Sequence, residues 1–303
     1  MPLPQTEMIP DPTACIDVLA PGDALSAMLG SQLAAVDCVS DALVEIENGA
    51  RLIAETIRAG KTLIYVAAGS SGLMALADSS ELPGTFGIPQ DQIRIVMAGG
   101  VPIDGKMPGG PEDDISQART IASGMSQDDL IIALSASGET PFTCEIARQA
   151  NRRGTKIIGI ANNSGSALLS VCDIPICLAS PPEILAGSTR MGAGTAQKVA
   201  LNLMSTLAGV MLGHVYNGMM INLQADNDKL IRRSARIVSK ILGISEVKAI
   251  TALEAGDGDT KRAVLIASGE VPERAGKLLE KHGQNLRSSL AELGFSGIIH
   301  DGS

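Results

Sequence analysis

Short runs of mostly apolar residues recur along the first two thirds of the chain. They occupy residues 62–67, 93–97, 130–134, 156–161 and 174–178. Runs of this length are typical of strands that are buried on both faces of a parallel sheet. The longer stretches between them carry apolar residues at helical spacing, so strands and helices alternate. This alternation predicts an α/β fold with a doubly wound, parallel, five-stranded sheet flanked by helices.

Helical patterns precede and follow the alternating region. Residues 13–60 carry apolar side chains at three- and four-residue spacing, and Gly60 is a typical helix stop. Residues 199–213 predict a buried helix too short to span a bilayer. Further amphipathic helices are predicted at 229–242, 245–255, 260–267 and 272–282. The expected domains are an N-terminal arm with helices (1–44), a sheet domain (45–222) and a small C-terminal helical bundle (223–303).

Two predicted strands end in loops that are rich in hydroxyl groups. AGSSG follows the strand at 62–67, and SASGET follows the strand at 130–134 just before Pro141 opens a helix. The carboxyl ends of parallel strands share one edge of a sheet, where helix N-termini present free N–H groups. Such loops can bind a phosphate without a fixed positive charge, although either could also serve only to cap its helix. The candidate phosphate ligands are Ser70, Ser71, Ser135, Ser137 and Thr140.

A long loop without periodic pattern connects the second and third predicted strands. It runs over residues 98–111 with the sequence AGGVPIDGKMPGGP. Loops of this length inside a compact domain tend to be functional. We therefore expect this loop to contribute to the site.

Composition narrows the possible partners. The net charge of −9 and a pI near 4.9 argue against nucleic acid and anionic membranes as partners. With five aromatic residues and no Trp, a saccharide would be held through hydrogen bonds. The five cysteines form no disulfide framework, and neither a metal site nor a cofactor is signalled. Since residues 1–11 do not resemble a signal peptide, we expect a cytoplasmic protein without membrane contact.

Several motifs together resemble one family. GSSG and SASGET are similar to the phosphosugar-binding loops of sugar isomerase (SIS) domains. DSSELPGTFG at 78–87, PEDD at 111–114, GSTRMGAGTAQK at 187–198 and NGMMINLQADNDKL at 217–230 resemble the N-acetylmuramic acid 6-phosphate etherases and the related glucokinase regulatory proteins. The similarity extends from about residue 45 onward. It implies that 45–222 is an SIS domain that binds a phosphorylated amino sugar, and that the protein is a homodimer.

The resemblance also implies an acid/base pair. Glu81, in the turn SELPGT, and Glu112, in GGPEDD, stand where the etherases carry their two catalytic glutamates. Eliminating the lactyl ether requires removal of a proton from carbon 2 and protonation of the oxygen on carbon 3, which two carboxyl groups can divide. From the residues alone, a structural role is the favoured interpretation for both glutamates, and Glu81 would then be a surface turn residue. Glu112 could be a charge at a helix start, like its neighbours Asp113 and Asp114.

Three further residues are candidates for substrate binding. Glu183 precedes the ILAGSTR run, where SIS proteins often place a ligand-binding or catalytic acid. Ser188 and Arg190 lie in the GSTRMGAGTAQK motif. Arg190 could pair with an anionic ligand or with one of the protein's own carboxylates, and the sequence leaves both open.

The sequence departs from the family pattern in three places, at four positions in all. Leu73 and Glu139 stand where the etherases usually carry Arg, and ELPGT replaces the usual ECPPT.

The favoured activity is lyase cleavage of the lactyl ether of N-acetylmuramic acid 6-phosphate to N-acetylglucosamine 6-phosphate and D-lactate, as part of amino sugar catabolism and peptidoglycan recycling. The alternatives are an aldose–ketose phosphosugar isomerase and a non-catalytic, phosphosugar-sensing regulator.

Overall fold

The protein forms two compact units in the structure, which is a computed structural model. It describes residues 6, 8, 15–107, 109–223 and 228–295. Unit 1 comprises the described residues of 1–80 and 90–207, and unit 2 comprises those of 81–89 and 208–303. The predicted boundary at residue 222 therefore lies within unit 2, and the N-terminal helix belongs to unit 1.

Unit 1 is built on a parallel five-stranded sheet in the order β2-β1-β3-β4-β5. The strands are β1 (Leu63–Ala67), β2 (Ile93–Met97), β3 (Leu130–Ser135), β4 (Lys156–Ala161) and β5 (Ile174–Cys177). Every residue of β1 and β3 is buried, as expected for central strands with helices on both faces. The predicted sheet is thus confirmed, with strand boundaries that differ from the predicted ones by at most one residue.

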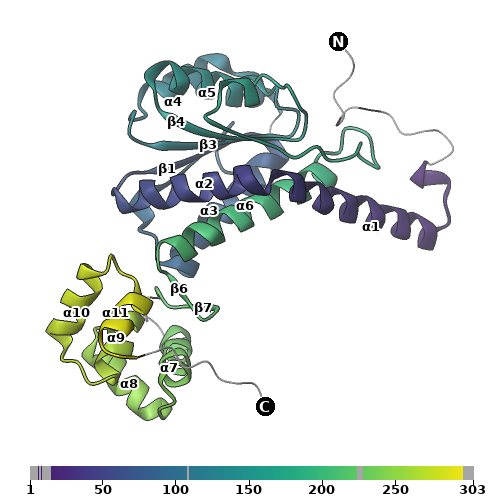
Figure 1. The fold of residues 1–303 in the computed structure, drawn as a ribbon. Coiled ribbons are helices and arrows are strands. Elements are labelled where there is room, and N and C mark those ends of the chain that lie inside the picture. The colour runs from purple at the N-terminus through teal and green to yellow at the C-terminus, as the bar shows by residue number, and fades with distance from the viewer. Residues whose placement is uncertain (1–5, 7, 9–14, 108, 224–227, 296–303) are drawn as a thin grey trace. The chain divides into compact units, whose positions relative to one another are not determined.

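Helices cover both faces of this sheet. Figure 1 shows α4 (Ile115–Ser123) and α5 (Pro141–Arg153) over one face, with α2 (Leu43–Arg58) and α6 (Gly192–Met211) over the other. On the α4–α5 side, the fully buried Phe142 and Ile146 pack with Ile131 of β3. Short 3-10 turns lie at Ile16–Val18, Cys38–Ala42, Gln90–Gln92, Gly110–Asp113 and Leu169–Val171.

The helical N-terminal region consists of α1 (Pro21–Asp37) and α2, joined by the turn at Cys38–Ala42. Gly60, at a φ of 68°, follows the end of α2, which confirms the predicted stop. In Figure 1, α1 extends past the sheet and away from α2. Its residues are mostly exposed, and Ala35 is its one buried residue.

The helix α3 (Gly69–Phe86) is longer than the sequence predicted. The segment around Glu81 was expected to be a turn, but the helix continues through Pro83. Proline inside a helix costs about 3 kcal/mol, because it removes one hydrogen bond. Burial offsets this cost, since Leu82 and Phe86 continue the buried stripe of Ala75 with exposed fractions of 2% and 5%. The prediction that Glu81 lies in a turn was therefore wrong.

The helix α6 also begins earlier than predicted, at Gly192 rather than at residue 199. The carboxylate of Glu183 accepts hydrogen bonds from the N–H groups of Gly192 and Ala193, both at 2.8 Å. A carboxylate on the first N–H groups of a helix stabilises its start. The glycine-rich motif is thus partly helical.

Unit 2 contains a small helical bundle and a two-stranded hairpin. Its helices are α7 (Asp228–Leu242), α8 (Glu246–Ala255), α9 (Thr260–Ala267), α10 (Pro272–Lys281) and α11 (Leu286–Glu292), and its strands are β6 (Val215–Tyr216) and β7 (Met219–Met220). The four predicted helices are confirmed, whereas α11 and the hairpin were not predicted. The bundle has its own core, which includes Val238, Val264 and Leu290.

Candidate functional site

The two hydroxyl-rich loops lie at the same edge of the sheet. β1 and β3 are parallel neighbours, with Ala67 paired to Leu134, and each loop follows directly after its strand. Neighbouring strands are about 4.8 Å apart, so the two loops begin side by side. The expectation that both loops flank one ligand position at the carboxyl edge is consistent with this topology.

The hydroxyl groups of the second loop form one hydrogen-bonded cluster. The Oγ of Ser135 lies 2.8 Å from Oγ1 of Thr140 and 3.3 Å from Oγ of Ser137, and it accepts the N–H of Gly138 at 3.0 Å. Ser135 is only 2% exposed, whereas Ser137 and Thr140 are half-buried. The side chain of Thr140 makes no capping bond to α5. Ser135 therefore organises the loop, and the other two hydroxyls are the ones a ligand can reach.

Contacts with the loop after β4 hold this cluster in shape. Gly138 has a φ of 72°, and a Cβ there would lie 2.2 Å from Oγ of Ser166. Only glycine fits, because the conformation and the space both exclude a side chain. The carboxylate of Glu139 accepts the N–H of Ala167 at 2.8 Å. Glu139, which stands where the etherases usually carry Arg, thus has a structural partner.

The first loop continues directly into α3, whose first turn carries Ser70 and Ser71. Ser70 is half-buried and Ser71 is 6% exposed. A buried polar centre on the same helix anchors it. Asp78 accepts hydrogen bonds from Tyr65 of β1 and from Asn202 and Ser205 of α6, each at 2.9 Å.

The pKa values of Asp78 and Tyr65 in this centre are raised. Burial raises the pKa of the Asp78 carboxyl, and its three hydrogen bonds oppose the increase. Burial, together with the neighbouring carboxylate, raises the pKa of Tyr65 well above its ordinary value. The centre joins β1, α3 and α6, so it fixes the helix that presents Ser70. Sequence reasoning did not find this centre, although Tyr65, a polar aromatic residue within an otherwise apolar strand, offered a weak signal.

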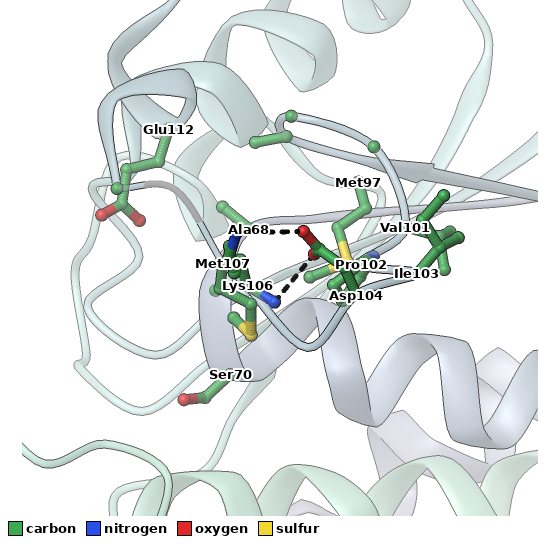
Figure 2. A pocket seen from close by; sticks show the side chains of 15 residues that line it. Ala68, Ser70, Met97, Val101, Pro102, Ile103, Asp104, Lys106, Met107 and Glu112 are labelled. Carbon is green, nitrogen blue, oxygen red and sulfur yellow. Dashed lines mark hydrogen bonds and ion pairs between the residues drawn. The ribbon is translucent and has the colours of Figure 1, made fainter.

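A cavity of about 830 Å³ opens beside the first loop, within the size range of small-molecule sites. Figure 2 shows its lining side chains. Ser70 and Glu112 both contribute to it, and the long loop expected to be functional forms most of the wall. The lining residues are Ala68, Gly69, Ser70, Met97, Ala98, Gly99, Gly100, Val101, Pro102, Ile103, Asp104, Lys106, Met107, Gly109 and Glu112.

Glu112 lies in the 3-10 turn before α4. A Cβ placed on Gly69 would be 3.9 Å from Oε2 of Glu112, so the carboxylate lies against the start of α3. The capping of α4 falls to Asp114, whose Oδ1 accepts the N–H of Gln117 at 2.8 Å. Within the described part of the chain, no hydrogen bond or ion pair engages the Glu112 side chain. Glu112 is therefore not needed as a helix-start acid.

The structure does not bring the other candidates into this cavity. Glu81 is exposed on α3 and belongs to unit 2, whereas Glu112 belongs to unit 1. Glu183 is 1% exposed, and both of its carboxylate oxygens bind the start of α6. Ser188 is half-buried and Arg190 is exposed, in the loop before α6. Their roles in catalysis and binding stay predictions.

Sequence reasoning missed one charged pair in the cavity wall. Lys106 Nζ lies 3.7 Å from Oδ2 of Asp104, and one of the two dashed lines in Figure 2 marks this ion pair. Among the described residues, no group of three or more His, Cys, Asp or Glu is arranged to hold a metal ion.

Comparison with known proteins identifies the chain's relatives. The SIS domain family model matches residues 110–207. An N-acetylmuramic acid 6-phosphate etherase of Symbiobacterium thermophilum is 41% identical over 75% of this chain and 76% of its own length. Another, from Deinococcus radiodurans, is 35% identical over 95% of both chains. A third, from Geobacillus thermodenitrificans, is 36% identical over 86% of this chain and 89% of its own. Because these relatives match most of the chain and most of their own lengths, the chain belongs to the family of N-acetylmuramic acid 6-phosphate etherases.

Proposed function

We propose that the protein is a carbon–oxygen lyase that converts N-acetylmuramic acid 6-phosphate and water into N-acetylglucosamine 6-phosphate and D-lactate. One observation carries the proposal. The cavity combines Ser70, at the start of a helix, with Glu112, whose carboxylate makes no hydrogen bond or ion pair with any residue that the structure describes. Membership of the etherase family supplies the substrate, since the relatives above carry that name.

The phosphate of the sugar would bind at the edge where the two hydroxyl loops begin. The helices α3 and α5 both start there, so their first N–H groups and positive dipole ends favour an anion. Ser70, Ser137 and Thr140 would add hydroxyl donors. A dianion held in this way needs no lysine or arginine in the loops.

The reaction needs a base and an acid. Glu112 would remove the proton from carbon 2, and a second carboxylic acid would protonate the ether oxygen on carbon 3. We propose Glu81 for this second role on the family resemblance alone, because Glu81 does not line the cavity. The bond from carbon 3 to oxygen breaks, lactate leaves, and a double bond forms between carbons 2 and 3. Water then adds at carbon 3 while carbon 2 regains a proton. Positioned proton transfer of this kind typically contributes 10²–10⁴-fold to a rate.

Isotope exchange tests this proposal. The wild-type protein in deuterium oxide should release lactate, and its hexosamine product should carry deuterium at carbon 2. Glu112→Gln should lose both lactate release and exchange by at least about 100-fold. Asp113→Asn, which removes the exposed neighbouring carboxylate, is the matched control and should retain both. If the wild type releases no lactate, the proposed activity is wrong.

The protein is further proposed to be a homodimer that pairs through α1. Leu25, Leu29 and Leu33 are 61–65% exposed, and they lie four residues apart on one face of the helix. A narrow leucine stripe of this kind is typical of helix–helix pairing. By length and composition, the helical stretch Pro21–Arg58 could also span a membrane, with 17% of the relevant window buried. We favour a second copy, because Asp23 and Gln32 interrupt the apolar character around the helix.

Light scattering tests the dimer. At micromolar concentration the wild type should have twice the mass of one chain, and Leu29→Glu with Leu33→Glu should have the mass of one. Ser26→Glu with Asp37→Asn, on the same helix, serves as the control and should remain dimeric. A monomeric wild type would contradict the proposal.

A cytoplasmic location is likewise proposed. Cys38, Cys144, Cys172 and Cys177 are free thiols, which suits a reducing compartment. Burial raises the pKa of Cys144 to about 11 and of Cys172 to about 12, so these thiols stay protonated and unreactive. The acidic net charge of −9 supports the absence of nucleic-acid and anionic-membrane partners.

A further inference from the structure

Lys106 is the one basic side chain among the described residues that line the cavity. The other charged lining residues are Asp104 and Glu112, both acids. Lys106 lies in the long loop between β2 and α4, within the same unit as Ser70 and Glu112. A cation therefore stands in the wall of a cavity whose other charges are negative.

The resting partner of Lys106 is a local one. Asp104 accepts the backbone N–H of Lys106 at 3.0 Å and contacts Nζ at 3.7 Å. Gly105, between them, has a φ of 75°, which lets the turn close. The two side chains are 86% and 58% exposed, so their pairing contributes little and is easily exchanged for another. Lys106 is thus held near the cavity by a contact that a ligand can replace.

The proposed substrate carries a second anion besides its phosphate, the carboxylate of the lactyl group. A carboxylate that enters a cavity beside Glu112 is repelled, and its desolvation is costly unless a cation pairs with it. The hydroxyl loops offer dipoles and are assigned to the phosphate. Leu73 is uncharged, and Glu139 is itself a carboxylate that binds Ala167. Neither residue can pair with the lactyl group.

We propose that Lys106 binds the lactyl carboxylate, exchanging Asp104 for the substrate, and so selects sugars that carry this group. The proposal deepens the activity proposed above and rests on it. An ammonium forms a charge-assisted hydrogen bond with a carboxylate. The same hydrogen bond would hold the lactyl group in place while the bond between carbon 3 and the ether oxygen breaks. Asp104 acts as a competitor for Lys106 in the empty site.

The experiment compares two sugars that differ only in the lactyl group. Lactate release gives KM for N-acetylmuramic acid 6-phosphate, and competitive inhibition gives Ki for N-acetylglucosamine 6-phosphate. Lys106→Met should raise KM about 10- to 100-fold, the range expected for loss of one charge-assisted hydrogen bond, and leave Ki within about twofold. Lys106→Arg should restore much of the loss. Asp104→Asn should lower KM and leave Ki unchanged.

Lys61→Met is the matched control, because Lys61 also pairs with an exposed aspartate, Asp128 at 2.9 Å, but does not line the cavity. It should change neither constant. If Lys106→Met weakens both sugars equally, Lys106 binds the phosphate or shapes the loop, and the proposal is overturned. An unchanged KM overturns it as well.

Failure of the proposed activity gives a different result. A wild type that releases no lactate refutes the lyase reaction, and both sugars can then be titrated by calorimetry without turnover. If Lys106→Met binds N-acetylmuramic acid 6-phosphate more weakly than the wild type and N-acetylglucosamine 6-phosphate equally well, the carboxylate contact is still supported. An equal loss of affinity for both sugars, or no loss for either, refutes it.

Discussion

Replacing the buried lysine of unit 2 with methionine should stabilise the protein at neutral pH. Lys261, on α9, is 1% exposed, and its Nζ donates one hydrogen bond, to the carbonyl oxygen of Gln284 at 3.0 Å. Burial lowers the pKa of Lys261 from 10.5 to about 8, and the nearby Asp259 opposes the change. The folded protein therefore carries a charge that its surroundings disfavour.

The expected gain in stability follows from the change in the pKa of Lys261. The difference between 10.5 and about 8, at about 1.4 kcal/mol per pH unit, corresponds to about 3 kcal/mol of destabilisation by the buried charge. Lys261→Met removes this cost but leaves the carbonyl of Gln284 without its donor, a loss of about 1–2 kcal/mol. The variant should therefore gain about 1–2 kcal/mol in the free energy of unfolding at pH 7.

The pH dependence distinguishes this cause from better packing. Between pH 8 and 10.5 the unfolded lysine keeps its proton while the folded one loses it. The unfolded state then binds more protons, so the stability of the wild type rises with pH. The advantage of Lys261→Met should be complete below pH 8 and shrink above it by about 1.4 kcal/mol per pH unit. A gain of about 1–2 kcal/mol should therefore reverse at about pH 9–9.5.

Urea unfolding, followed by circular dichroism at several pH values, measures the difference between variant and wild type. Lys277→Met, which removes an exposed lysine from the neighbouring α10, is the control and should change stability little at any pH. A stability difference for Lys261→Met that stays constant between pH 7 and 10 would refute the reasoning, because it could not arise from the protonation of Lys261.

Three other expectations concern the site. Ser137→Ala with Thr140→Val should weaken N-acetylglucosamine 6-phosphate binding by about 3–6 kcal/mol in calorimetry, since two hydrogen bonds to a charged group are lost. Unchanged affinity would show that the phosphate does not bind at this loop. Glu183→Gln should lower the free energy of unfolding by about 1–3 kcal/mol, because an amide has one oxygen and cannot replace both carboxylate oxygens that accept the N–H groups of Gly192 and Ala193. A variant as stable as the wild type would show that this cap contributes little. Lactate release should persist in a chelator such as EDTA, because glutamates carry the proposed proton transfers; activity lost in EDTA and restored by zinc or magnesium would contradict this.

The sheet and the phosphate loops could be predicted from the sequence because their signals are local. A strand buried on both faces must be apolar along its whole length, and a run such as residues 130–134 shows this directly. Glycine and hydroxyl residues after such a run mark a loop at the carboxyl edge of the sheet. Four helices of unit 2 could be predicted for the same reason, from the spacing of their apolar residues and from N-cap residues such as Ser245.

Other features depend on partners that are distant in sequence, and only the tertiary structure decided them. The segment SELPGT was predicted to be a turn at Glu81, but burial of Leu82 and Phe86 outweighed the hydrogen bond lost at Pro83, and α3 continues through it. Asp78 finds its partner Asn202 across 124 positions of the chain. Local pattern cannot show such contacts, because their free energy comes from desolvation and pairing between elements. The sequence by itself determined the fold class and the two hydroxyl-rich loops at the carboxyl edge of the sheet. That Lys106 and Glu112 line the same cavity depended on how the long loop after β2 folds, which local pattern cannot show.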